Sequence, residues 1–202
     1  MISIDLLDFF HQFIVSRARA RRNHLQFVLT SDEARQFKAY SEALGERVVP
    51  CFGSLAMGDS WAVEFAQAAH ASLLRRQGLR TAAEAVIPGR PLPRSTFLDI
   101  LQIDDHVGIE VVAAGARGTR ADKVFAAAAT GYHAAQLPVN TTKQVRNQAG
   151  GTVLGALLTT EGSLSAPPPK VLVLIEMTFR VFAQASSLSC CWSRCLGLGS
   201  SR

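Results

Sequence analysis

Three aspartates stand at the ends of apolar, strand-like segments, and carboxylates in such a setting can hold divalent metal ions. Asp5 closes an apolar segment at the start of the chain, and Asp104 and Asp105 are adjacent between two short apolar runs. Carboxylates brought close together raise one another's pKa unless a cation neutralises them, and hard oxygen ligands select Mg²⁺ or Mn²⁺. Two such ions about 4 Å apart activate an attacking hydroxyl and stabilise a leaving oxygen in phosphoryl transfer. The aspartates therefore indicate metal-dependent phosphoryl transfer, provided that their segments pair.

The runs on either side of the acidic pair predict a β-hairpin with Asp104 and Asp105 at its tip. Residues 97–103 and 106–112 are short and rich in β-branched and aliphatic side chains. Aspartate also suits a tight turn for conformational reasons alone, so an ordinary turn is the simpler interpretation of the pair by itself. Neighbouring apolar strands tend to pair, and a strand over residues 1–6 beside this hairpin would bring Asp5 to the pair.

A helix is expected after residues 57–60. Asp59 or Ser60 can serve as its N-cap, and Gly78 fits the position just past its C-terminus. Its expected apolar face consists of Ala62, Val63, Ala66, Ala69 and Leu73. The proline- and glycine-rich residues 81–95 are expected to form a linker.

A second helix is expected from about residue 120 to 135. Thr119 precedes it, and Asp122 three residues later completes a pattern similar to a capping box. Further strands are expected over 25–29, 48–52 and 153–158, with a turn over 159–163 and an apolar segment of ambiguous type over 170–183. The order of strand, helix, hairpin, helix and hairpin predicts an α+β fold, with helices packed on one face of an antiparallel sheet.

Composition indicates a folded chain with basic clusters. Of 202 residues, 48% are hydrophobic and 18% charged, which excludes a mainly disordered chain, and the net charge is +5. Arginines cluster within 17–22, 75–80 and 90–94. Such clusters suit a polyanionic partner such as a nucleic acid. Basic clusters considered by charge alone are more often a solvated face of the protein.

Other chemistries find little support in the sequence. Cys190, Cys191 and Cys195 crowd near the end without a second Cys or His cluster that would complete a zinc site, and a reducing compartment is expected. The histidines show no metal-ligand spacing, and no Gly-x-Ser-x-Gly is present. Neither a basic leader nor a membrane-spanning apolar run is visible. We expect an intracellular protein, cytoplasmic or nuclear, that is not secreted and does not bind membranes.

Five segments resemble, in order, the motifs of retroelement reverse transcriptases of the LTR/gypsy-like or a related type. Residues 3–13 resemble the first palm motif, in which an aromatic follows an aspartate after four residues. Residues 55–60 resemble the second, a Leu-Pro-x-Gly-like turn leading into a helix, and 102–105 are similar to the x-x-Asp-Asp box. Residues 137–143 resemble the segment with the palm lysine. Residues 153–171 resemble the Phe-Leu-Gly hairpin and the Pro-Pro-x-Lys-Val start of the thumb.

The resemblance implies a domain organisation. Residues 1–166 would form a polymerase palm with a ferredoxin-like core, and 167–185 would begin a thumb-like segment. Residues 186–202 have no match and are expected to be a disordered tail. Because the family's fingers lie upstream of the first motif, we expect a truncated palm that is inactive or weakly active.

The resemblance also implies a metal site. Asp5, Asp104 and Asp105 would hold two Mg²⁺ or Mn²⁺ ions, and Lys143 would lie near the triphosphate as a general acid. A lysine in this sequence context is equally often an ordinary surface residue without a catalytic role.

Three further residues would bind the nucleotide. Phe10 would lie under the incoming sugar and exclude a ribose 2′-hydroxyl, and the turn at Met57 and Gly58 would let the backbone approach the nucleotide and template closely. Alternatively, Phe10 is an aromatic residue of the core, and Gly58 is an ordinary turn glycine before a helix.

The sequence departs from the family pattern at three positions: Gln102 replaces an aromatic, Ala56 replaces a proline, and Asp59 adds an acid beside a polyanion.

The expected function is that of an RNA-directed DNA polymerase fragment, which extends a primer 3′-hydroxyl on an RNA or DNA template with dNTPs. The alternative is a non-catalytic nucleic-acid-binding remnant of a retroelement. A different metal-dependent phosphotransferase or nuclease using the same acids ranks third. The sequence leaves the oligomeric state open.

Overall fold

The computed structural model describes residues 1–113, 115–116 and 118–178. The chain divides into two compact units, Met1–Gln148 and Ala149–Arg202. The first unit is built on an antiparallel sheet in the order β1-β5-β4. These strands are β1 (Ile2–Asp5), β4 (Phe97–Gln102) and β5 (Asp105–Glu110).

Residues 139–145 extend this sheet beyond β1 through two isolated antiparallel bridges, Ser3 to Val145 and Leu6 to Val139. Counting this segment as a fourth strand, the chain order is β-α-β-β-α-β and the spatial order is fourth, first, third, second. That arrangement is the ferredoxin-like split β-α-β motif.

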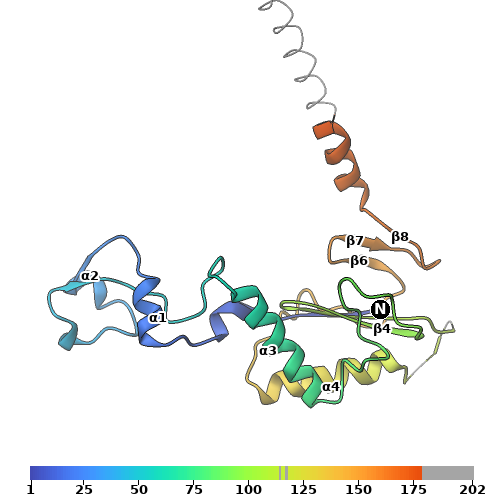
Figure 1. Cartoon of the computed structure of the whole chain (residues 1–202), viewed down its shortest axis with the longest axis horizontal. Helices are drawn as coiled ribbons and strands as arrows, with labels where there is room; N and C mark the ends of the chain where they lie inside the picture. The colour runs from blue at the N-terminus through green and yellow to red at the C-terminus, as the bar shows by residue number, and fades with distance from the viewer. Residues whose placement is uncertain (114, 117, 179–202) are drawn as a thin grey trace, which may run out of the picture. The chain divides into compact units, whose positions relative to one another are not determined.

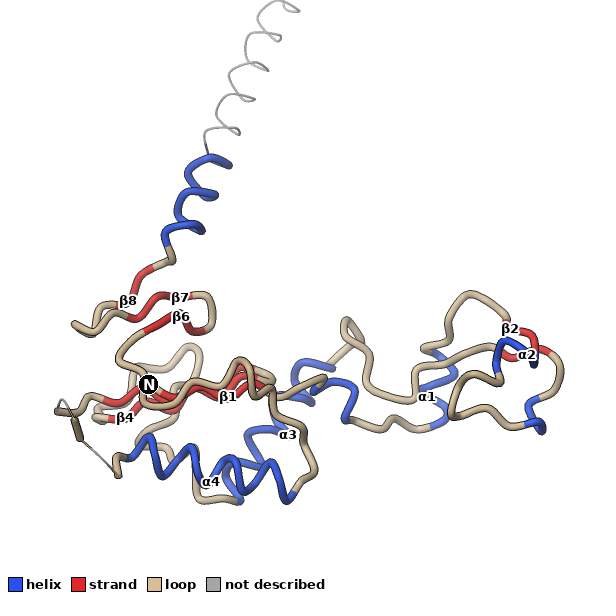
Figure 2. The backbone as a smooth tube through the Cα atoms, turned by 180° about the vertical axis from the view of Figure 1, so that it is seen from behind, coloured by secondary structure: helices blue, strands red, loops and turns tan. Residues whose placement is uncertain are grey.

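Two helices of fifteen residues, α3 (Ala62–Arg76) and α4 (Arg120–Ala134), pack on the same face of the sheet (Figures 1 and 2). The α+β prediction with helices on one face is confirmed. The core between the layers includes Ile2, Ile4, Leu6, Phe9, Ala66, Leu74, Phe97, Leu101, Val124, Ala128 and Tyr132.

The ends of the helices follow local signals only in part. Thr119 and Asp122 form the expected capping box of α4. At the C-terminus of α3, Gly78 has φ 71° and its N–H donates to the Arg75 carbonyl, while Leu79 N–H donates to the Leu74 carbonyl. This pair of hydrogen bonds is the Schellman motif, which a glycine favours.

The predicted N-cap of α3 was wrong. Trp61 occupies that position with φ 66° and makes no side-chain cap hydrogen bond. Asp59 is unavailable because the Arg19 guanidinium pairs with its carboxylate, with Arg19 Nε 2.9 Å from Asp59 Oδ2. An ion pair with a full charge competes successfully with a backbone N–H for the carboxylate.

The predicted apolar face of α3 was also only partly correct. The buried residues of the helix are Ala62, Ala66, His70, Ala71 and Leu74. Val63 is exposed instead. The buried stripe includes a histidine, which an analysis based on hydrophobicity passes over.

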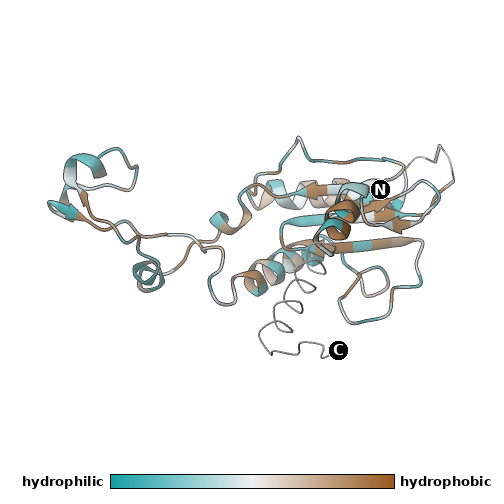
Figure 3. Cartoon of the chain, turned by 90° about the horizontal axis from the view of Figure 1, so that it is seen from above, coloured by the Kyte–Doolittle hydropathy of each residue, from teal (hydrophilic) through white to brown (hydrophobic). Residues whose placement is uncertain are grey.

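Residues 14–61 carry only short elements. After η1 (Phe9–Gln12), this part of the chain holds α1 (Arg17–Arg22), β2 (Leu29–Thr30), α2 (Ser31–Ala34), η2 (Glu42–Leu44) and β3 (Arg47–Val48). The strands predicted over 25–29 and 48–52 are reduced to the two-residue pair β2–β3. Figure 3 shows polar residues on the short helices of this segment and apolar residues along the strands of the main sheet.

The second unit contains the sheet β6-β7-β8, made of β6 (Gly151–Val153), β7 (Ala156–Leu158) and β8 (Leu164–Ser165). The single strand predicted over 153–158 was wrong. Leu154 (φ 47°) and Gly155 (φ 76°) instead form a two-residue turn between β6 and β7. Two left-handed residues suit such a turn because they match the twist of the hairpin.

Residues 168–178 of the second unit are helical. Over the described ranges, no helix is long and apolar enough to cross a membrane. The predicted boundaries at 166 and 185 stay predictions, and the tail predicted over 186–202 lies outside the described residues.

Candidate functional site

The β1–β5 register places Asp5 directly opposite Asp105. The Leu6 N–H donates to the Asp104 carbonyl at 3.2 Å, which fixes the turn against the end of β1. Burial raises the pKa of Asp105, and the charges of Asp104 and Asp5 raise it further, while Lys143 opposes them. The expected pairing is confirmed, and the three carboxylates lie at one end of the sheet.

Asp5 is held by two groups from residues 140–143. It is 6% exposed, and its Oδ2 accepts a hydrogen bond from Asn140 Nδ2 at 3.2 Å. Lys143 Nζ lies 2.9 Å from the same oxygen. The hydrogen bond to Asp5 and its charge raise the pKa of the Lys143 ammonium. The structure thus brings Lys143 to Asp5, together with Asn140, which the sequence prediction did not include.

The turn between β4 and β5 is one residue earlier than predicted. Its two residues are Ile103 and Asp104, and Asp105 already belongs to β5. Ile103 has φ 52°. That first turn position favours glycine, and a left-handed conformation is strained for a β-branched residue. Strain of this kind persists only where the surroundings impose it, and it concentrates at functional sites.

Two side chains of α3 hold the backbone of Ile103. The Ile103 N–H donates to Gln67 Oε1 at 2.6 Å, and His70 Nδ1 lies 2.6 Å from the Ile103 carbonyl oxygen. Gln67 Nε2 also donates to the Leu101 carbonyl at 3.1 Å. Residues three apart share a helix face, so one face of α3 satisfies both polar groups of the turn residue. Two polar residues at this spacing within an apolar stripe were the available signal in the sequence.

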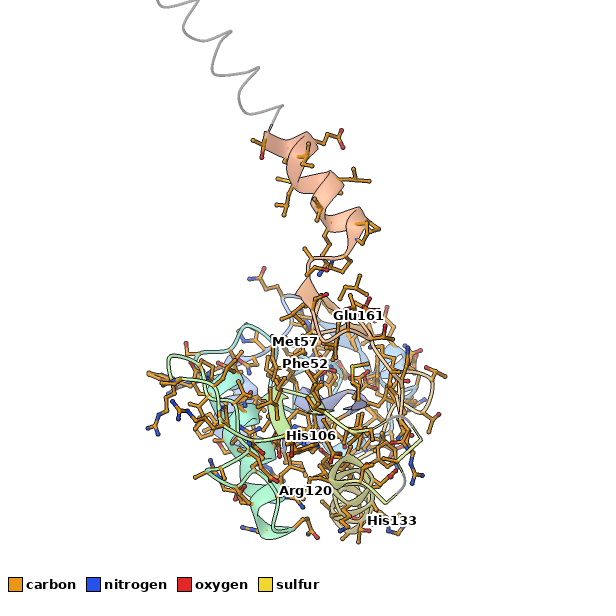
Figure 4. The ribbon with its side chains drawn as sticks, turned by 90° about the vertical axis from the view of Figure 1, so that its right-hand side faces the viewer. Phe52, Met57, His106, Arg120, His133 and Glu161 are labelled. Carbon is orange, nitrogen blue, oxygen red and sulfur yellow. The ribbon has the colours of Figure 1, made fainter. Side chains whose placement is uncertain are left out.

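A buried polar chain continues from His70 away from the turn. His70 Nε2 lies 2.7 Å from Tyr132 Oη, and that hydroxyl lies 3.2 Å from His106 Nδ1. His106 Nε2 lies 3.2 Å from Asp99 Oδ1, without the alignment of a hydrogen bond, and Arg80 Nη1 lies 3.0 Å from the same oxygen. Figure 4 shows His106 among the side chains of the interior and His133 at the outer edge of its helix.

The charge states of this chain differ along its length. Burial lowers the pKa of His70 to about 4, so its imidazole is neutral at pH 7. Burial opposes ionisation of Asp99, but contact with His106 and the charges of His106 and Arg80 hold its pKa below the usual value. The sequence signal for Asp99 was a charged residue at an inward-facing position of an alternating strand, which demands a partner.

The nucleotide-binding residues predicted from the resemblance, Phe10, Met57 and Gly58, belong to the first unit. Phe10 belongs to η1 and is partly buried against the core. Met57 is 72% exposed, and Gly58 has φ 85° with open space where a Cβ would project. Within the described residues, no hydrogen bond joins the turn at Met57 and Gly58 to the three acids.

The three aspartates offer carboxylate oxygens, which are the ligands that a hard divalent ion prefers, and their like charges repel one another. No group of three or more His, Cys, Asp or Glu side chains that could hold a metal ion is gathered in the part of the chain that the structure describes. Lys143 supplies the positive charge at Asp5. A metal ion at this oxygen would therefore replace the ammonium.

Some arginines of the basic clusters form ion pairs within the protein, and the others are exposed to solvent. Arg19 pairs with Asp59, and Arg80 is buried against Asp99. The arginines of the clusters that remain exposed are Arg17, Arg21, Arg22, Arg75, Arg76, Arg90 and Arg94. Two of the expected phosphate-binding arginines are thus engaged in structural ion pairs.

Comparisons with known proteins identify the fold. No family model matches the sequence. No curated protein matches it either. Among solved structures, the chain is similar to a foamy viral protease–reverse transcriptase determined in complex with an RNA/DNA hybrid. The TM-score is 0.51 at 14% sequence identity, over 83% of this chain and 17% of that one. The chain therefore spans about a sixth of that protein, and the fold that it shows is a mixed α+β, reverse-transcriptase-like fold.

Proposed function

We propose that this chain carries the catalytic aspartates of an RNA-directed DNA polymerase. It would transfer a nucleotide from a dNTP to a primer 3′-hydroxyl on an RNA or DNA template. The observation that carries the proposal is the strand register, which sets Asp5 opposite Asp105 in a reverse-transcriptase-like fold.

The three acids have the role of metal ligands in this proposal. Asp5, Asp104 and Asp105 would hold Mg²⁺ or Mn²⁺, which when bound activates the attacking hydroxyl and neutralises developing charge. Lys143 would leave Asp5 for the triphosphate. A lysine amine is protonated at neutral pH without any partner, so Nζ can donate a proton to the leaving oxygen.

Phe10, Met57 and Gly58 would bind the incoming nucleotide. Met57 is exposed, and Gly58 leaves open space at its Cα, so a sugar or base can approach that backbone closely. The exposed arginines would contact the backbone phosphates of the template and primer.

Primer extension with Mg²⁺ or Mn²⁺ on a primed RNA template tests the proposal. Asp104→Asn/Asp105→Asn should lose activity by a factor on the order of 10² or more, because charge-stabilising groups at a reacting centre contribute that much. Asp32→Asn is the matched control, since Asp32 of α2 forms an exposed pair with Arg35, which directly follows the helix. Equal extension by the wild type and the double variant would exclude these acids as the metal site.

A non-catalytic nucleic-acid-binding protein is the second candidate. It is favoured by the Lys143–Asp5 pair, which neutralises one of the acids without a metal ion. Here template binding would weaken as salt rises, and no extension would occur with either ion. Degradation of the template without added dNTPs would instead indicate a nuclease.

A further inference from the structure

The left-handed backbone of Ile103 requires support, and the structure shows where that support comes from. We propose that His70 is a positioning residue for the Asp104–Asp105 turn, and that the Tyr132 hydroxyl holds His70 in the tautomer that this role needs. The effect on catalysis rests on the proposed function, whereas the tautomer and the shape of the turn do not.

The hydrogen bond at the turn fixes the first proton. A backbone carbonyl oxygen only accepts, so at 2.6 Å from the Ile103 oxygen the His70 Nδ1 must carry a hydrogen and donate it. The imidazole is neutral, since burial lowers its pKa to about 4. Its Nε2 therefore has a lone pair and can only accept.

The second hydrogen bond then fixes the Tyr132 hydroxyl. At 2.7 Å from His70 Nε2, the hydroxyl must donate its proton to that nitrogen. Its oxygen remains free to accept from His106 Nδ1, 3.2 Å away. The bonds thus run in one direction, from His106 through Tyr132 and His70 to the turn, and hydrogen bonds aligned in this way strengthen one another.

The geometry explains why both Gln67 and His70 are needed. Gln67 accepts from the Ile103 N–H and His70 donates to the Ile103 carbonyl, so the peptide groups on both sides of the strained residue are fixed. If the histidine bond is lost, the carbonyl is free to rotate, and the next residue in the chain is Asp104. The orientation of both acids toward Asp5 would then vary.

The tautomer can be measured without any activity. Long-range ¹H–¹⁵N correlation spectra of the ¹⁵N-histidine-labelled full chain at pH 7 should show His70 as the Nδ1–H form. Tyr132→Phe, which removes only the hydroxyl, should convert His70 at least partly to the Nε2–H form and shift the Ile103 amide signal. His133→Asn is the control, because this exposed histidine lies on the same helix. A wild-type His70 in the Nε2–H or doubly protonated form would overturn the proposal.

Kinetics test the positioning role. His70→Asn keeps an N–H donor at the δ position, whereas His70→Leu removes it. We expect Tyr132→Phe and His70→Asn to lower kcat about tenfold or less with the KM for dNTP unchanged, and His70→Leu to lower it about a hundredfold. Equal losses in the two His70 variants, or a change confined to KM, would contradict the role.

The two possible failures are distinguishable. If the wild type extends no primer, the proposed function fails, but the spectra of the wild type and Tyr132→Phe still decide whether His70 holds the turn. If His70→Leu does not fold, Tyr132→Phe and His70→Asn carry the kinetic test.

Discussion

The main sheet with α3 and α4 differs from residues 14–61 in what it does with its apolar side chains. In the sheet region, Ile2, Phe97 and Tyr132 are fully or almost fully buried. In the intervening segment, Ile14 is 93% exposed and Trp61 70% exposed. Further large apolar side chains that are exposed in this segment are Phe27, Val28, Phe37, Leu44, Val49, Phe52 and Met57.

Element length explains the difference. The helices α3 and α4 are long enough to bury a complete face against the sheet. By contrast, α2 has four residues and β2 and β3 two each, and elements that short cannot bury a face of their own. Exposed apolar side chains that gather into one patch are typical of an interaction region. Stability should therefore come from the sheet region, and changes there should have the larger effects.

Loss of the buried ion pair should be the most severe test of this view. Arg80→Leu leaves the fully buried Asp99 without its guanidinium partner, and breaking such a pair costs about 4 kcal/mol in the free energy of unfolding. Urea denaturation measures it. Arg35→Leu is the matched control, because its pair with Asp32 is exposed, so stability should hardly change. Similar effects of the two variants would refute the distinction between the regions.

Acid should weaken the sheet region through His70. The pKa of His70 is about 4 in the folded chain against an ordinary 6.5, so between these values the unfolded chain binds the additional proton. Stability therefore decreases as pH falls from 6.5 to 4, by about 3 kcal/mol from this group. Urea titrations at pH 7 and pH 4.5 should show a smaller decrease in His70→Asn than in the wild type. His133→Asn should behave like the wild type, and an unchanged slope in His70→Asn would count against the assignment.

The sequence predicted the parts of the fold that depend on local signals. Short runs rich in β-branched and aliphatic side chains identified the β4–β5 hairpin, and capping chemistry located Thr119 and Gly78, because these signals act within a few residues. The pairing of Asp5 with Asp105 was also accessible, since neighbouring apolar strands tend to pair. Segment 14–61 was less predictable because its strands have little burial to enforce an alternating pattern.

The remainder could not be predicted because the partners are distant in sequence. Ile103 adopts a left-handed conformation only because α3 satisfies its backbone, and this moves the turn by one residue from the position that aspartate propensity favours. Asp99 is tolerated in a buried strand only because Arg80 and His106 approach it in the folded state. Polar residues at inward-facing positions of an apolar pattern were the one indication of this network.

A methyl group added at a glycine should be tolerated less well in the sheet than in α4. A Cβ at Gly108 would lie 2.7 Å from Phe97 Cζ and 2.8 Å from Ile2 Cγ1, both in the core. Overpacking of this kind costs about 2 kcal/mol, so Gly108→Ala should lower the thermal unfolding midpoint. Gly131→Ala is the comparison, because the neighbour there is the flexible Gln77 side chain and alanine favours a helix. Equal destabilisation would show that α4 packs as rigidly as the sheet.

The smallest expected effect comes from the capping box, a motif that occurs both in the sheet region and in residues 14–61. Thr119 caps α4 and Thr30 caps α2, each with an acidic partner three residues later that completes the capping box. Removal of an N-cap hydroxyl costs about 1 kcal/mol where the helix belongs to the cooperative core. Thr119→Ala should therefore lower the global free energy of unfolding by about that amount, measured with urea.

Thr30→Ala should leave global unfolding nearly unchanged, because α2 is too short to contribute to the core. Its effect should instead be local, as faster amide exchange and faster proteolysis within residues 14–61, since opening of that segment does not require the sheet to unfold. If Thr30→Ala lowers global stability as much as Thr119→Ala does, the segment unfolds together with the sheet. The exposed apolar side chains would then belong to a structure that is stable by itself, and not to one that awaits a partner.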